Sequence, residues 1–252
     1  MIKIVVSGYL GKMGQVLGNQ IENKDNMELV GGIDKNIGSY KGETKVYENI
    51  ASFDDSCDVI IDFSHPTSLD DLLDYAKSNK VALVIGTTGY GEKEIKKLEE
   101  GSKEIPIFYS ANMSLGVNLL LSLASKAASV LNEDYDIEIM ERHHNQKIDA
   151  PSGTAYMIAN KINEVFDNNK VYTFGRHTKN NKRSSKEIGI HAIRGGTIVG
   201  DHTVLFAGLD ETIEIKHNAS SKNVFAKGAL RAAEFIVTKD KGLFNMDDII
   251  NQ

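Results

Sequence analysis

The fold is decided by the stretch Ile2-Lys3-Ile4-Val5-Val6-Ser7-Gly8-Tyr9-Leu10-Gly11-Lys12-Met13-Gly14. Ile2–Ser7 is an apolar run of the length of a buried strand, and the residues from about Lys12 to Asn23 have the apolar spacing of a helix. Three glycines occupy the turn between them. A strand, a glycine turn and a helix in direct succession indicate the first unit of a doubly wound α/β sheet.

The glycine turn suits a dinucleotide, whose pyrophosphate would lie at the helix N-terminus while the glycines let the backbone approach it. Its spacing departs from G-x-G-x-x-G, because Leu10 holds the usual place of the second glycine. Alone, the turn is equally compatible with an ordinary strand–helix loop. Asp34 strengthens the dinucleotide interpretation, since it ends the next predicted strand, where an acid accepts the ribose hydroxyls.

The first half of the chain alternates strands and helices. Further strands are predicted at Leu29–Asp34, Asp58–Phe63, Val81–Ile85 and Ile105–Tyr109. Helices are predicted at Thr67–Asn79 and Glu92–Lys103. Short apolar strands separated by helices indicate a parallel sheet that is covered on both faces.

Two polar segments follow strands of this sheet, Gly86-Thr87-Thr88-Gly89 and Ser110-Ala111-Asn112-Met113-Ser114. Ligands of open α/β sheets bind outside the carboxyl ends of the strands, where both segments should lie. Small polar residues there could hydrogen-bond a nicotinamide amide and leave room for its ring. Either segment by itself is also compatible with plain loop chemistry.

The pattern changes after a long apolar helix predicted at Leu115–Leu131, which is suited to bridging two lobes. Strands are then predicted at Tyr135–Arg142, Ile188–Arg194, Thr197–Ala207 and Glu211–His217, with a tight connection or bulge at Val199–His202. Consecutive strands indicate a smaller α+β domain with a mixed or antiparallel sheet. We therefore expect a dinucleotide-binding domain over 1–114 and a second domain over 115–224. Residues 225–252 should return to the first domain, with a helix at Val224–Thr238.

Most of the functional information lies in the stretch Glu141-Arg142-His143-His144-Asn145-Gln146-Lys147-Ile148-Asp149-Ala150-Pro151-Ser152-Gly153-Thr154. Apolar residues after Thr154 recur at helical spacing, and Ser152 or Asp149 can cap that helix. Its first free backbone N–H groups form an anion site, contributed by Ser152, Gly153 and Thr154. Proton donors beside an anion site predict an enzyme that acts on a small carboxylate or phosphate.

Each part of that stretch also has a simpler interpretation. His143 and His144 could be zinc ligands, but adjacent strand residues point to opposite faces and the chain has a single cysteine, so we expect no metal. A lone Lys147 is usually a solvated surface residue, and a Pro-Ser-Gly-Thr run is usually a turn with a helix cap. The combination is what favours a catalytic site.

The composition limits the classes of protein. With 41% hydrophobic and 25% charged residues, the 252-residue chain is ordinary for a soluble globular protein. Its net charge of −6 argues against nucleic-acid binding, and its one basic cluster, Arg176–Lys186, reads by default as a solvated loop. A single cysteine fits a reducing compartment. With no signal peptide and no apolar run long enough for a membrane span, we expect a cytoplasmic protein.

These motifs together resemble the dihydrodipicolinate reductase family (4-hydroxy-tetrahydrodipicolinate reductase). The similarity extends over nearly the whole chain and rests on Gly8-x-x-Gly11-Lys12-Met13-Gly14, Val84–Gly89, Ala111–Ser114, Glu141-x-His143-His144-x-x-Lys147-x-Asp149–Thr154 and Val199-Gly200-x-His202. The histidine–lysine–PSGT segment is very specific, whereas the glycine turn is not. The family's G-x-x-G-x-M-G form also accounts for the departure in glycine spacing.

The resemblance implies a Rossmann-type cofactor domain and a second domain that carries the substrate site and a homotetramer interface. It implies reduction of 4-hydroxy-tetrahydrodipicolinate to tetrahydrodipicolinate by NADH or NADPH, in diaminopimelate and lysine biosynthesis. By the same mapping His143 and Lys147 are the acid/base residues, and the substrate carboxylates bind His144, Gly153 and Thr154. The implied cofactor residues are Gly8, Tyr9, Leu10, Gly11, Lys12, Met13, Asp34, Lys35, Gly86, Thr87, Thr88, Ser110, Ala111, Asn112 and Met113.

Two alternatives remain open from the residues alone. The chain could be a nucleotide-sensing module whose second lobe mediates assembly, or an amino-acid dehydrogenase such as an aspartate dehydrogenase. Assembly has a separate argument, because the second lobe carries more apolar residues than a lobe of this size should cover alone: Ile188, Ile190, Val204 and Phe206. We therefore expect burial between subunits, and the family resemblance implies a homotetramer that binds a small dicarboxylate, with no nucleic-acid or membrane partner.

Overall fold

The chain divides into two compact units. The computed structural model describes residues 1–38, 40–177 and 179–251. The first unit consists of Met1–Leu115 together with the segment that begins at Asn223, and the second of Gly116–Lys222. The second unit is therefore an insertion within the first.

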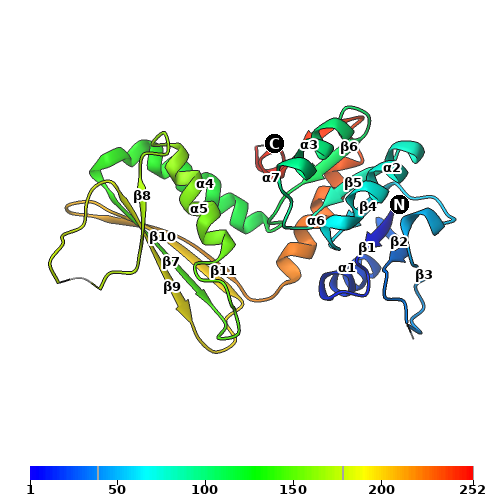
Figure 1. Cartoon of the computed structure of the whole chain (residues 1–252), viewed down its shortest axis with the longest axis horizontal. Helices are drawn as coiled ribbons and strands as arrows, with labels where there is room; N and C mark the ends of the chain where they lie inside the picture. Colours follow the sequence, from blue (N-terminus) through cyan, green and yellow to red (C-terminus); the bar gives the residue numbers. More distant parts are fainter. Residues whose placement is uncertain (39, 178, 252) are drawn as a thin grey trace. The chain divides into compact units, whose positions relative to one another are not determined.

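The first unit contains a seven-stranded sheet of order β12-β6-β5-β4-β1-β2-β3, in which every neighbouring pair is parallel (Figure 1). The bounds are β1 Ile2–Ser7, β2 Met27–Ile33, β3 Val46–Tyr47, β4 Val59–Asp62, β5 Ala82–Ile85, β6 Pro106–Tyr109 and β12 Gly242–Phe244. The predicted parallel sheet is thus confirmed. β3 and β12, which the sequence analysis did not predict, are the sheet's two edge strands.

Helices cover both faces of this sheet, as predicted. The bounds are α1 Lys12–Glu22, α2 Leu69–Asn79, α3 Glu92–Gly101, α6 Asn223–Ile236 and α7 Met246–Ile250, with short 3-10 turns at Ile50–Ser52 and Pro66–Ser68. One core contains α1 and α6 side chains, and the other contains α2 and α3 side chains. Since both sheet faces are buried, the central strands are apolar throughout their length.

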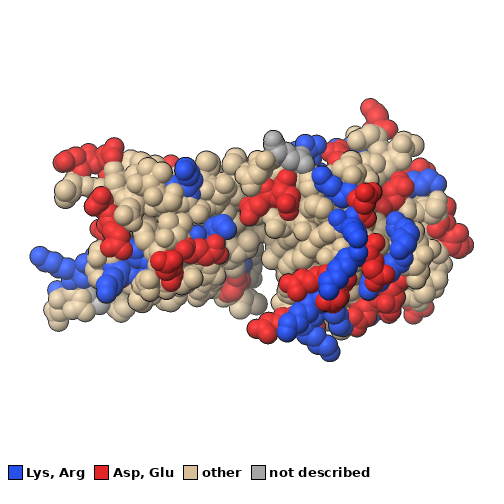
Figure 2. Space-filling view, turned by 90° about the horizontal axis from the view of Figure 1, so that it is seen from above, with Lys and Arg blue, Asp and Glu red and all other residues tan. Residues whose placement is uncertain are grey.

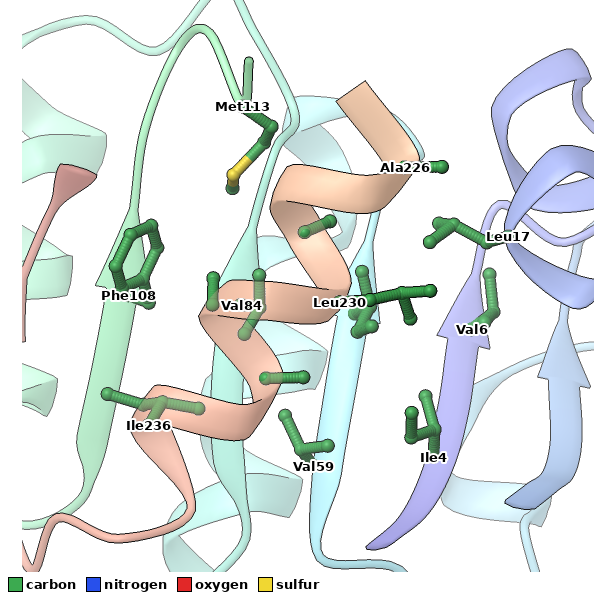
Figure 3. Close-up of a cluster of buried hydrophobic side chains, with 14 of the residues drawn as sticks. Ile4, Val6, Leu17, Val59, Val84, Phe108, Met113, Ala226, Leu230 and Ile236 are labelled. Atoms are coloured by element: carbon green, nitrogen blue, oxygen red, sulfur yellow. The ribbon is translucent and has the colours of Figure 1, made fainter. Parts of the chain in front are cut away.

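Helix α6 completes the first of these cores (Figure 3). Its alanines, including Ala226 and Ala229, are fully buried, and Leu230 and Ile236 reach the residues of the central strands. A Cβ on Gly228 would lie 1.6 Å from the Met113 carbonyl oxygen, so glycine is required where α6 passes that loop. Small residues therefore let α6 approach the sheet closely.

The second unit contains a mixed five-stranded sheet of order β11-β10-β7-β9-β8. The bounds are β7 Asp136–His143, β8 Val171–Phe174, β9 Glu187–Arg194, β10 Gly200–Ala207 and β11 Thr212–Ala219. β10 pairs antiparallel with β7 and β11, whereas β9 pairs parallel with β7 and β8. The predicted mixed sheet is confirmed, although β8 was not predicted.

The expected connection at Val199–His202 is wrong. Gly200 and His202 lie in β10, in regular register with Ala219 and His217 of β11. The connection between β9 and β10 lies earlier, at residues 195–199. The strand therefore begins early enough to bring His202 alongside β7.

Two helices, α4 (Leu115–Leu131) and α5 (Gly153–Glu164), pack on this sheet. Their contacts already bury the four apolar residues from which assembly was argued, because Ile188, Ile190, Val204 and Phe206 are at most 1% exposed within the single chain. That argument for subunit burial is wrong, since α4 and α5 supply the cover.

The sequence analysis expected no apolar run long enough to span a membrane, and helix α4 departs from that expectation. Together with the 3-10 turn that follows, it spans Leu115–Asp134, 20 residues of mean hydropathy 1.3, which is sufficient by length and composition for a membrane span. Core helices of globular proteins pass the same test, and Leu120, Ala124 and Ala128 lie in the core of the second unit. The helix therefore carries no argument for a membrane.

Candidate active site

The glycine turn between β1 and α1 has the close approaches that only glycine permits. Gly8 has φ +77°, and a Cβ there would lie 2.6 Å from the Phe63 carbonyl oxygen. A Cβ on Gly14 would lie 2.3 Å from the Gly8 carbonyl oxygen. The chain thus turns tightly from β1 into α1 and leaves backbone, rather than side chains, at the start of the helix.

A cavity of about 280 Å³ lies against this turn and is lined by Gly8, Gly11, Asp34 and Lys35, four of the predicted cofactor residues. Asp34 Oδ2 accepts a hydrogen bond of 3.0 Å from the Leu10 N–H, and its Oδ1 accepts one of 2.9 Å from the Asn36 N–H. The carboxylate is therefore held at the cavity by backbone donors. The cavity fits part of a dinucleotide in the position that the motif predicts.

The lining includes residues that the sequence analysis missed. They are Ser7, Ile33, Asn36, Glu48, Asn49, Ile50, Phe63, Ser64, His65, Ser68, Asp71 and Leu72. Several follow β4, whose end was not recognised as functional because Ser64-His65-Pro66 reads as an ordinary polar turn. The alignment of β4 beside β1 in the sheet is the signal that could have identified them.

The other predicted cofactor segments follow β5 and β6, which pair in parallel, so their ends share one edge of the sheet. Several of their side chains face inward. The Thr87 hydroxyl donates to Asp62 and accepts from the Ser64 N–H, and the Asn112 carbonyl oxygen Oδ1 accepts from the Ser114 N–H. Met113 lies in the hydrophobic core (Figure 3). These side chains fasten the loops.

Tyr9 also differs from its expected role. Its side chain is 5% exposed, packs against Gly32 and donates to the Thr44 hydroxyl. It is therefore a core residue, and only its backbone faces the turn. Lys12 and Lys35, in contrast, are exposed.

In the second unit the candidate catalytic segment is organised by Glu141, which is fully buried on β7. Arg194 donates to both carboxylate oxygens at 2.7 and 2.8 Å. His143 Nδ1 lies 2.6 Å from Oε2, and the Ser152 N–H donates to Oε1 at 2.9 Å. Burial raises the pKa of Glu141, but these donors outweigh it and hold that pKa below its usual range, so the group is a carboxylate.

A carboxylate beside Nδ1 fixes the orientation of His143. With Nδ1 directed to Glu141, Nε2 is the candidate nitrogen for a proton exchange. A Cβ on Gly200 would lie 3.1 Å from Nε2, so glycine at the start of β10 leaves space beside that atom.

His202 lies next to this pair, with its ring centroid 5.2 Å from that of His143. Its Nε2 is 3.0 Å from the Ser152 hydroxyl, which in turn accepts from the Ala155 N–H and caps α5. Burial, with the nearby His143 as a smaller cause, lowers the pKa of His202 to about 4. A neutral His202 therefore supports the cap near neutral pH, and Ser152, not Asp149, is the capping residue.

The remaining predicted residues surround the start of α5. Lys147 Nζ pairs with the exposed Asp149 at 2.8 Å, and its backbone N–H donates to the His144 carbonyl. Gly153 begins α5, and a Cβ there would meet nothing within 4 Å. The expected anion site is narrower than predicted, because the Ser152 N–H is already bound to Glu141. Gly153 and Thr154, the first two residues of α5, are the other residues predicted for that site.

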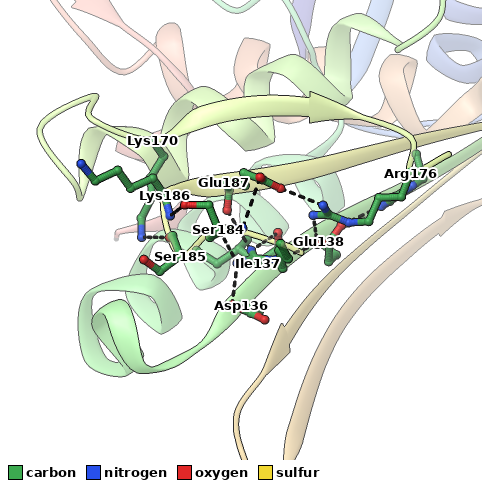
Figure 4. Close-up of polar contacts among 11 residues, drawn as sticks. Asp136, Ile137, Glu138, Lys170, Arg176, Ser184, Ser185, Lys186 and Glu187 are labelled. Atoms are coloured by element: carbon green, nitrogen blue, oxygen red, sulfur yellow. Dashed lines mark hydrogen bonds and ion pairs between the residues drawn. The ribbon is translucent and has the colours of Figure 1, made fainter. Parts of the chain in front are cut away.

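The basic cluster is a largely exposed loop, as expected from sequence, but two of its arginines form ion pairs. Arg176 pairs with Glu138 and Glu187, while Arg183 pairs with Asp136 and Glu138 (Figure 4). Elsewhere, basic and acidic side chains are interspersed on the face seen in Figure 2. Among residues 1–38, 40–177 and 179–251, no group of three or more potential metal ligands exists.

The two units together define a class of protein. The first has a parallel doubly wound sheet with a glycine turn and an acid after the second strand. The second has an oriented histidine beside a helix N-terminus. The chain is a two-domain, pyridine-nucleotide-dependent oxidoreductase. Residues 2–113 match the family model for the N-terminus of dihydrodipicolinate reductase, and residues 116–250 match that for its C-terminus. The chain belongs to the dihydrodipicolinate reductase family.

Individual relatives agree with this assignment. The chain is 48% identical over 252 residues to 4-hydroxy-tetrahydrodipicolinate reductase of Caldanaerobacter subterraneus subsp. tengcongensis. The matched region covers 100% of this chain and 99% of that relative. It is 47% identical to the Clostridium novyi enzyme of the same name, with 99% and 98% covered. The resemblance inferred from the motifs is therefore confirmed.

Solved structures give the same fold. Dipicolinate-bound dihydrodipicolinate reductase from Paenisporosarcina sp. TG-14 superposes with a TM-score of 0.81 at 28% identity, and 97% of each chain is covered. An aspartate dehydrogenase from Thermotoga maritima gives 0.51 at 12% identity, with 93% of this chain and 96% of that one covered. The second likeness shows a shared fold alone, and the family assignment disfavours the aspartate dehydrogenase alternative.

Proposed function

We propose that this chain reduces 4-hydroxy-tetrahydrodipicolinate to tetrahydrodipicolinate with NADH or NADPH, in diaminopimelate and lysine biosynthesis. The relatives carry the name of this activity, and one solved relative binds dipicolinate, a small dicarboxylate. The observation that carries the proposal is the buried Glu141 carboxylate. Its Oε2 orients His143, and its Oε1 accepts a hydrogen bond from the N–H of Ser152, the residue just before α5.

A bound nicotinamide supplies the hydride, and this chain's residues supply the proton and the binding of charge. Loss of the substrate's 4-hydroxyl group as water gives a conjugated imine, and hydride addition to that imine leaves an enamine-like anion that must be protonated. His143, with Nδ1 held by Glu141, presents Nε2 as the acid. Glu141 holds the ring in this orientation, because its buried carboxylate lies 2.6 Å from Nδ1.

The dicarboxylate is assigned to the start of α5. The N–H groups of Gly153 and Thr154 point out of the helix N-terminus, where a carboxylate is favoured. His144 lies on the same segment, and Lys147 supplies a positive charge next to it. Asp149 is exposed, so its ion pair with Lys147 is weak enough for a substrate carboxylate to replace.

The cofactor is assigned to the glycine turn, Asp34 and the strand ends of the first unit. Asp34 is suited to the ribose hydroxyls of NADH and repels the 2′-phosphate of NADPH, whereas the exposed Lys35 offsets part of that repulsion. We therefore expect both cofactors to serve, with NADH ahead by less than about tenfold, since an exposed charge pair contributes about 1 kcal/mol or less. We further propose a cytoplasmic homotetramer, as the family resemblance implies.

The test is a coupled assay in which an aldolase condenses pyruvate with aspartate semialdehyde to supply the substrate, while absorbance follows NAD(P)H consumption. Oxidation that requires both aldolase precursors is the expected result. NADH binding without any turnover would favour the nucleotide-sensing alternative. Turnover with oxaloacetate and ammonia in place of the aldolase product would favour an aspartate dehydrogenase.

A further inference from the structure

The proposed mechanism leaves one buried acidic group of the first unit without a role. Asp62 ends β4 and is fully buried. Its Oδ1 accepts from the Ser64 hydroxyl and its Oδ2 from the Thr87 hydroxyl, each at 2.5 Å, and the Ser7 side chain also hydrogen-bonds to it. Hydroxyl groups from three separate segments thus converge on one carboxyl group.

Asp62 is unusual because it has no cationic partner. In the described part of the chain, no lysine, arginine or histidine forms an ion pair with it. Burial raises the pKa of Asp62, and the hydroxyls of Ser64, Thr87 and Ser7 act in the opposite direction. Burying an acid in this way costs stability unless its hydrogen bonds are satisfied. An apolar residue at this position would therefore give a more stable core.

The three hydroxyl groups belong to the ends of the three central strands of the sheet. Ser7 ends β1, Ser64 follows β4 and Thr87 follows β5. The segments are also joined directly, because the Ser64 N–H donates to the Thr87 hydroxyl at 2.9 Å. Asp62 is the common acceptor that holds these strand ends in one arrangement.

That arrangement borders the cavity assigned to the dinucleotide. Ser7 and Ser64 line the cavity, whereas Asp62 does not. The carbonyl oxygen of Phe63, between Asp62 and Ser64, is the atom that a Cβ on Gly8 would meet at 2.6 Å. A shift of the β4 end would therefore disturb the glycine turn as well.

We propose that Asp62 is a positioning residue for the dinucleotide: it fixes the ends of β1, β4 and β5 in the arrangement that NADH and NADPH bind. The inference rests on the proposed cofactor site and extends it to a residue that does not itself line the cavity. Because Asp62 acts through backbone common to both cofactors, and not at Asp34 and Lys35, it should affect NADH and NADPH equally.

The experiment compares Asp62→Asn with Asp58→Asn, the same change on an exposed residue just before the same strand, whose carboxylate binds the Lys3 N–H. Asp62→Asn should raise the Kd of NADH, measured by fluorescence titration, and the KM of both cofactors by about threefold to tenfold, the scale for losing a buried hydrogen bond. The KM of the dicarboxylate should stay within about twofold of wild type, and Asp58→Asn should match wild type throughout.

Two milder variants keep the test decisive if Asp62→Asn does not fold. Thr87→Val and Ser64→Ala each remove one hydroxyl and should raise the Kd of NADH in the same direction by a smaller factor. Unchanged cofactor affinity in all folded variants, with only a lower Tm, would overturn the proposal and leave Asp62 a purely structural residue. Because the NADH titration does not need turnover, this result is independent of whether the wild type reduces the proposed substrate.

Discussion

Gly200 gives a sharp test of the active-site geometry. In Gly200→Ala the new Cβ would lie 3.1 Å from His143 Nε2, whereas ordinary van der Waals contacts begin near 3.4 Å, so the ring must move by a few tenths of an ångström. Its Nδ1 bond to Glu141 and the neighbouring His202 ring resist that movement. A misplacement of 1 Å costs about 10²-fold in rate, so we expect kcat to fall about fivefold.

The control is Gly195→Ala, in the connection before β10, where a Cβ would meet nothing within 4 Å. Both variants add one methyl group, and the coupled NADH assay measures kcat for each, with Tm as a check on folding. We expect Gly195→Ala to keep the wild-type kcat. Equal kcat in Gly200→Ala and Gly195→Ala would refute the inference that Gly200 leaves space for Nε2.

Four further predictions follow from the site. Lys147→Ala and His143→Ala should each lower kcat by about 10²-fold or more while NADH affinity stays near wild type, and unchanged turnover in both would remove their assignment. Activity should survive EDTA, and its loss with recovery on adding zinc would reassign the histidines. In kcat/KM, NADH should exceed NADPH by less than about tenfold, and a hundredfold preference for NADPH would show that Asp34 repels phosphate less than argued. Because the folded pKa of His202 lies near 4, below its ordinary 6.5, stability should fall as pH drops from 6.5 to 4, by up to about 3 kcal/mol, and urea unfolding of His202→Gln should show a shallower loss.

The sequence predicted the elements that carry strong periodicity. Strands β1, β4, β5 and β6 and helices α1, α4 and α6 lie within about two residues of their expected bounds, because each buries a regular set of apolar side chains. The strands β3, β8 and β12 were missed, since they have only two to four residues and pair at or near sheet edges. Such short segments contain too few residues for an alternating pattern to appear.

Candidate site residues could be named from the sequence where they are local in the chain. His143, Lys147 and Gly153 occupy one continuous segment, and the motif that they form singled them out. Arg194 and His202 were not assigned roles, because strand pairing between β7, β9 and β10 brings them to Glu141 and Ser152 from more than forty positions away. A single sequence does not contain that register.

The basic cluster Arg176–Lys186 is a second case in which partners distant in sequence could not be predicted. Arg176 and Arg183 look like a solvated run in sequence, and their partners on β7 become evident only when the sheet is formed. Arg176, Arg183 and the His191 ring contact Glu138 and hold its pKa below the usual range against the raising effect of burial. The two arginines fasten the β8–β9 loop to the sheet.

The position of α6 in the chain has a consequence for synthesis of the protein. The ribosome completes β1, β4, β5 and β6 early, but the helix that covers one face of these strands is made only after the whole of residues 116–222. At ordinary elongation rates that interval is on the order of ten seconds. During it, the nascent sheet exposes an apolar face to solvent, so we expect chaperones to engage ribosome-bound chains that end before Asn223 and to release them once α6 has emerged.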